Sequence, residues 1–193
     1  MGRKVAYVVL GGLMFGVAMA VLKGQESDAR GVIGNLSAPW VAVAFLGGAL
    51  AVRPSRGAIL GIAVTMAAFI GFYLSEAAIL DLGPHPWYDK VRLAAGTLNT
   101  YEQWGVLSGL VYGSLGALWA SRSMRVAPLA VALAFLCEPL AVALLTRFKI
   151  WGGGGLLNHP AIWGGEVVVG VALAAAVVVR RWAGPGARSA PGR

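Results

Sequence analysis

The chain has 193 residues, of which 58% are hydrophobic and only 12% are charged, and its mean hydropathy is +0.73. A soluble domain of this size does not have this composition, so we interpret the chain as an integral membrane protein. The net charge of +8 comes from basic residues that flank apolar segments, which favours topology signals and contacts with membrane lipid headgroups over nucleic-acid binding. The single cysteine, Cys137, excludes an intramolecular disulfide and a cysteine-based zinc framework.

Six segments are long and apolar enough to cross a bilayer as helices, which takes about 20 residues each. The first also has the basic start of a signal peptide, but its apolar run exceeds the usual signal core, so we expect a retained first helix. The second contains Asn35, Ser37 and Pro39, which predict irregular first turns. In chain order the segments are Val5–Leu22, Val32–Val52, Gly57–Ser75, Glu102–Ala120, Val126–Leu145 and Pro160–Val179.

These segments predict an all-α, polytopic helix bundle in the cell membrane. We expect one six-helix transmembrane domain over residues 1–183 and a basic tail over 184–193. The positive-inside rule places both termini in the cytoplasm, because the inner segments then contain basic residues and no acid. Those inner basic residues are Arg3, Lys4, Arg53, Arg56, Arg122, Arg125, Arg180, Arg181, Arg188 and Arg193.

All eight acidic residues fall on the outer side or in the outer half of a predicted span. Glu138 and Glu166 lie inside spans, whereas Glu76 and Glu102 lie at the outer ends of the third and fourth. An ionised side chain at membrane depth is costly, so it is usually directed at a bundle interior, a partner or a cavity. Pro139 follows Glu138 directly and predicts a kink beside this carboxyl group. We therefore expect carboxyl groups from four helices to approach one level in the outer half of the bilayer.

A carboxyl group in apolar surroundings can stay protonated and act as a general acid. We predict this role for Glu138, with Glu166, Glu102 or Asp81 as its partner. The alternative is a structural hydrogen bond or an ion pair. The sequence has no phosphate loop, dinucleotide fingerprint or paired-aspartate motif, so we predict no metal and no cofactor.

Aromatic residues are also concentrated on the predicted outer side. Such residues commonly form an interfacial belt, but their uneven distribution also predicts an aromatic-lined cavity. The predicted lining consists of Tyr73, Trp104, Tyr112, Phe135 and Trp163, with Glu76 and Asn35 as polar contacts.

Several stretches resemble known membrane proteins. They are Asn35–Trp40, Arg53–Gly57, Phe72–Leu74, Trp104 with the following Gly109–Gly116, and Glu138. Together they look like small multi-pass proteins of actinobacteria and, more distantly, the membrane-bound terpene cyclases of indole sesquiterpenoid and fungal meroterpenoid pathways. Those enzymes use membrane-embedded carboxylic acids, without a metal, to protonate an alkene or epoxide. The resemblance implies a class II-like cyclisation of a lipophilic, prenylated aromatic molecule, in which aromatic faces stabilise carbocations.

Two other interpretations stay open. Six helices with small residues at Gly12, Gly16 and Ala20 also resemble the substrate-capture subunits of vitamin uptake transporters. In that case the outer cavity would hold a vitamin, the glycine run 152–155 would belong to a lid, and the first helix would pack against a coupling protein. More simply, the small residues allow close helix packing. The third interpretation is a structural or regulatory protein without a pocket, in which the four carboxyl groups would lie far apart.

Overall fold

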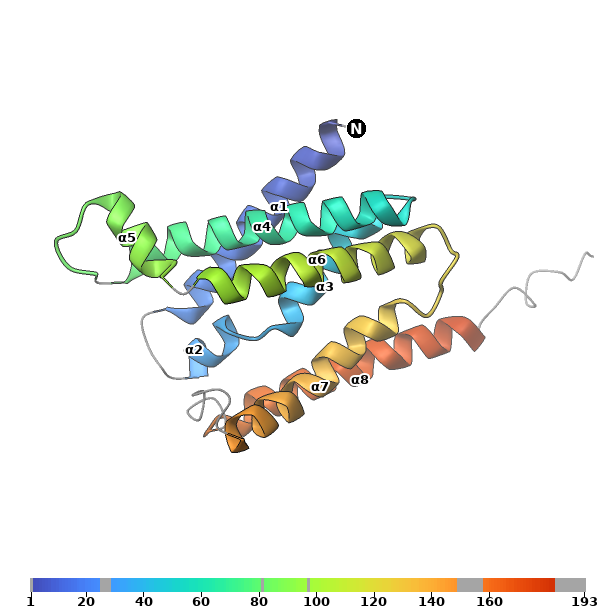
Figure 1. Ribbon diagram of the computed structural model, residues 1–193. Helices are drawn as coiled ribbons and strands as arrows, with labels where there is room; N and C mark the ends of the chain where they lie inside the picture. Colours follow the sequence, from blue (N-terminus) through green and yellow to red (C-terminus); the bar gives the residue numbers. More distant parts are fainter. Residues whose placement is uncertain (1, 25–28, 81, 97, 149–157, 183–193) are drawn as a thin grey trace, which may run out of the picture.

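The computed structural model of the chain describes residues 2–24, 29–80, 82–96, 98–148 and 158–182, and these residues form α-helices and no strand (Figure 1). The predicted all-α helical bundle is therefore confirmed. Proline stands at the start of three long helices, where its missing N–H costs no helical hydrogen bond. The helices are α1 (Gly2–Lys23), α2 (Ala29–Gly34), α3 (Ala38–Ala49), α4 (Pro54–Ile79), α5 (Trp87–Ala94), α6 (Leu98–Ala120), α7 (Pro128–Arg147) and α8 (Pro160–Trp182).

Five segments within the described residues are long and apolar enough to cross a membrane, one fewer than predicted. They are Val5–Lys23, Ala29–Ala49, Pro54–Ile79, Pro128–Arg147 and Pro160–Arg180. The predicted fourth span corresponds to α6, which is not among these five, and its apolar residues are interspersed with glycine, serine and aromatic residues. The predicted second span is present as Ala29–Ala49, and residues 35–37, where irregular backbone was predicted, separate α2 from α3 within it.

The connections alternate between two ends of the bundle. The α3–α4 and α6–α7 turns and the end of α8 lie on the right in Figure 1, whereas α5 and the starts of α2 and α8 lie on the left. This alternation brings the basic pairs Arg53 with Arg56 and Arg122 with Arg125 to the same end. The predicted orientation requires this arrangement. That this end of the bundle faces the cytoplasm stays a prediction. The tail 184–193 lies outside the described residues.

Glycines allow α1, α4 and α6 to pack closely. A Cβ atom added at Gly113 of α6 would lie 2.4 Å from the carbonyl oxygen of Gly57 on α4. One added at Gly16 of α1 would lie 1.9 Å from the Ala68 oxygen, and one at Gly12 would lie 2.4 Å from the Val64 oxygen, both on α4. The small-residue face of the first helix is therefore covered by α4. This is the close helix packing that small residues allow, and a contact of α1 with a coupling protein stays a prediction.

Helices α7 and α8 form an antiparallel pair beside the other helices (Figure 1). Only 17% of the apolar window of α7 and 11% of that of α8 are buried, against 50% for α4. The pair contacts the rest of the bundle through α2, α3 and α6. Pro139 lies inside α7, which continues beyond it to Arg147. The position of this helix pair relative to the bundle therefore depends on a small number of contacts.

Candidate functional site

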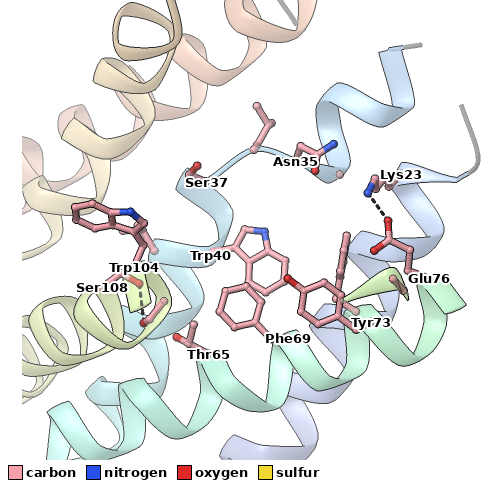
Figure 2. Close-up of a pocket in the computed structure, with 16 residues that line it drawn as sticks. Lys23, Asn35, Ser37, Trp40, Thr65, Phe69, Tyr73, Glu76, Trp104 and Ser108 are labelled. Carbon is pink, nitrogen blue, oxygen red and sulfur yellow. Dashed lines mark hydrogen bonds and ion pairs between the residues drawn. The ribbon is translucent and has the colours of Figure 1, made fainter. Parts of the chain in front are cut away.

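A pocket of about 370 Å³ lies between α1, α3, α4 and α6, next to the α2–α3 break (Figure 2). This volume is within the range of natural small-molecule sites. The lining residues combine aromatic rings with a few polar groups. They are Lys23, Gly34, Asn35, Leu36, Ser37, Trp40, Val41, Thr65, Phe69, Phe72, Tyr73, Glu76, Ala94, Trp104, Gly105 and Ser108.

Stacked aromatic rings form one wall of the pocket. The ring centroids of Trp40 and Phe69 are 4.8 Å apart at an interplanar angle of 28°, and those of Phe69 and Tyr73 are 6.1 Å apart at 22°. Phe72 meets Trp40 edge to face at 5.7 Å. Such pairs add about 0.5–1.5 kcal/mol each beyond the burial of their area. The packing therefore fixes the rings in place and directs aromatic surface into the pocket, as Figure 2 shows.

An ion pair stands at the end of the aromatic wall. Lys23, in the last turn of α1, pairs with Glu76 of α4, and its ammonium group lies 5.3 Å from the centroid of the Phe72 ring. Glu76 is only 6% exposed, so its carboxylate needs a partner of opposite charge. The pocket therefore has one charged end and one apolar wall.

Glu138 lies at the break between α2 and α3. Its two carboxylate oxygens accept hydrogen bonds from the backbone N–H groups of Ser37, at 2.5 Å, and Ala38, at 2.6 Å. Ser37 occupies the N-cap position of α3, and its side chain makes no capping hydrogen bond to the described residues of this helix. The free N–H groups at a helix N-terminus favour an anion, so Glu138 of α7 supplies the cap that α3 lacks locally. At the other side of the break, the Asn35 amide donates to the Gly31 carbonyl oxygen at 2.7 Å.

Glu166 of α8 lies close enough to Glu138 for the two carboxyl groups to interact. It is 4% exposed, and neither of its oxygens accepts a hydrogen bond from a donor among the described residues. The structure thus brings two of the four predicted carboxyl groups together. Glu76 is paired with Lys23 instead, the Glu102 side chain is outside the described part of the chain, and so is Asp81.

The pocket contains part of the predicted site. In the described structure, Glu138 is not one of its lining residues, although Ser37, to which it is bonded, is one. Tyr73, Trp104, Glu76 and Asn35 all line it.

The other predicted lining residues pack elsewhere. Tyr112 and Phe135 pack against the cluster that contains Phe45 and Val131, and Trp163 packs with Val32, Leu36 and Val142. Tyr112 lies about 12 Å farther along α6 than Trp104, which takes it beyond the pocket.

The lining residues that the sequence analysis did not predict include Lys23 and, on the α4 face that forms the aromatic wall, Phe69 and Phe72. Phe69, Phe72, Tyr73 and Glu76 follow one another at spacings of three, one and three residues, which is the pattern of a single helical face. That spacing was a signal in the sequence. Lys23 had no such signal, because its partner is 53 positions away in the chain.

Comparison with protein-family models, with curated proteins and with solved structures found no match to the chain.

Proposed function

We propose that the chain is a membrane-embedded small-molecule-binding protein that works as the substrate-capture subunit of an uptake system. The observation that carries this proposal is the 370 Å³ pocket, which has an aromatic wall and a charged group that is already neutralised by its partner. Such a pocket can hold a molecule without reacting with it. The predicted orientation places its mouth toward the outside of the cell, where a nutrient arrives.

The chemistry of the lining indicates an amphipathic ligand. A flat apolar or aromatic part fits against the stacked rings of Trp40, Phe69 and Tyr73. A polar or charged part of the ligand fits at the Lys23–Glu76 end. An anionic ligand group can replace Glu76 as the partner of Lys23, and a cationic ligand group can replace Lys23 as the partner of Glu76. A water-soluble vitamin with an aromatic ring has this combination of groups.

Acid-initiated cyclisation of a prenylated molecule is the second candidate. The observation in its favour is that a carboxyl group, that of Glu76, lies beside the aromatic rings of the pocket. Cyclisation starts from a protonated acid, however, and Glu76 forms an ion pair with Lys23, which uses the carboxylate form. Glu138 likewise serves as an acceptor for two backbone N–H groups. For these reasons we place capture before cyclisation.

The proposal is tested by purifying the chain in mild detergent and identifying retained small molecules by mass spectrometry. Trp104→Ala removes a lining side chain that is 64% exposed, so little stability is lost. Trp87→Ala is the matched control, because Trp87 is 53% exposed and lies outside the described lining. We expect one compound to be retained by the wild type and by Trp87→Ala and lost from Trp104→Ala.

Two results would count against capture. One is that no compound is retained and none of a set of aromatic vitamins binds the purified wild type. The other is conversion of a prenylated indole to an isomer by wild-type membranes, with loss of conversion in Glu76→Gln, which would establish cyclisation in its place.

A further inference from the structure

The contact between Glu138 and Glu166 is unusual because Glu166 is buried and the polar group next to it is another acid. Glu166 is 4% exposed, and no donor among the described residues gives a hydrogen bond to either of its carboxyl oxygens. An ionised carboxylate in that position would be desolvated without compensation. The group that acts on it is another carboxyl group, that of Glu138, so the surroundings do not compensate its charge.

Glu138 differs from Glu166 in its own contacts. Each of its oxygens already accepts a backbone N–H group, from Ser37 and from Ala38. Both donors belong to the first turn of the twelve-residue α3, whose free N–H groups are suitable partners for an anion. A carboxylate oxygen has more than one acceptor position, so Glu138 can also accept an O–H group from its neighbour.

No basic group of α3 can neutralise the pair, since this helix has no titratable side chain. The other elements that pack around it carry the following described titratable groups: Arg30 on α2, Tyr112 on α6, Cys137 and Arg147 on α7, and Arg180 on α8. Arg30 donates to the carbonyl oxygens of Val21 and Leu22, and Arg147 and Arg180 lie at helix ends. A bound proton is small enough for this enclosed space and can neutralise the charge of Glu166.

We propose that Glu138 and Glu166 form a proton-binding site at the α2–α3 break, in which Glu166 carries the proton and donates it to the carboxylate of Glu138. The pair then has one negative charge, which the α3 N-terminus stabilises. When the proton leaves to water, two carboxylates in contact repel each other. The repulsion weakens the hold of Glu138 on the Ser37 and Ala38 N–H groups, and Ser37 lines the pocket. The proton thus controls the segment that shapes one wall of the pocket.

The site is tested without a pocket ligand, so its outcome does not depend on the proposed function. Infrared spectra of the detergent-purified chain, labelled with ¹³C at the glutamate carboxyl carbons, are recorded over a pH series. We expect a C=O band of a protonated glutamate at neutral pH that disappears at alkaline pH and is missing from Glu166→Gln. Thr146→Val is the matched control, because the Thr146 hydroxyl is also buried without a partner among the described residues of this helix pair but does not titrate; the band should persist in it.

Hydrogen exchange of the peptide that contains Ser37 and Ala38 provides the second measurement. At alkaline pH we expect faster exchange in the wild type than in Glu166→Gln, which cannot ionise, and equal exchange in the two proteins at neutral pH. A wild-type spectrum without a protonated glutamate band at neutral pH would overturn the proposal even if Glu166→Gln failed to fold. Equal exchange of the two proteins at every pH would overturn the link between the proton and the break.

Discussion

Replacing Glu138 by alanine should destabilise the fold at the α2–α3 break. The change removes the acceptor of two backbone hydrogen bonds and the cap of α3. A hydrogen bond to a charged group contributes about 1.5–3 kcal/mol, and an unsatisfied buried donor costs about 1–3 kcal/mol. Ala38 is buried and Ser37 is exposed, so water can replace the bond at Ser37 but not the bond at Ala38. We therefore expect a loss of about 2–4 kcal/mol in total.

Thermal unfolding of the detergent-purified chain measures this loss. For a chain of this size 1 kcal/mol corresponds to about 2–4 °C in Tm, so Glu138→Ala should lower Tm by about 4–16 °C. Glu138→Gln keeps one acceptor oxygen and should lose about half as much. Cys137→Ala changes an exposed neighbour on the same helix and should stay within about 0.5 kcal/mol of the wild type. If Glu138→Ala unfolds at the wild-type temperature, Glu138 is not the cap of α3 and the reasoning about the break is wrong.

Three further predictions concern packing, charge and orientation. Gly113→Ala should lower the free energy of unfolding by about 1–3 kcal/mol or more, because its methyl group would meet α4. Gly11→Ala, whose Cβ would meet no neighbouring atom of the described residues within 4 Å, should cost nothing. The unfolding temperatures of the two variants compare these losses, and equal losses would contradict the packing. Lys23→Met leaves buried Glu76 without its described partner and should cost about 3 kcal/mol, part of which Lys23→Met combined with Glu76→Leu should restore in a double-mutant cycle. Ser55→Cys, in a background without the native cysteine, should react with an impermeant thiol reagent only in inside-out vesicles, and labelling of intact cells would reverse the orientation.

The break at residues 35–37 connects the two features of the molecule that carry chemistry. Its Ser37 lines the pocket and donates to Glu138. Irregular backbone at membrane depth is tolerated where protein or a cavity satisfies its polar groups, and here Asn35 and Glu138 do so from the two sides. A broken helix of this kind is a common means of placing helix ends beside a bound ion or substrate.

The sequence was informative wherever one local property decides the outcome. Apolar runs of the length of a bilayer cannot leave their backbone groups unpaired, so they must be helices, and the helical bundle follows from that requirement alone. Asn35, Ser37 and Pro39 predicted irregular backbone in the second span, and the structure has its break at residues 35–37. The basic turns predicted which helix ends lie together, and the structure has that alternation (Figure 1).

The sequence could not determine which partner each buried acid has, and the tertiary structure decided this. Glu138 is 101 positions from Ser37 in the chain, and Lys23 is 53 positions from Glu76. Whether such groups meet depends on the rotation and crossing of helices that pack through glycines such as Gly57 and Gly113. The cost of burying a charge shows that an acid inside the membrane needs a neighbour. Only the packing of the helices determines whether that neighbour is a lysine, a backbone amide or a second acid.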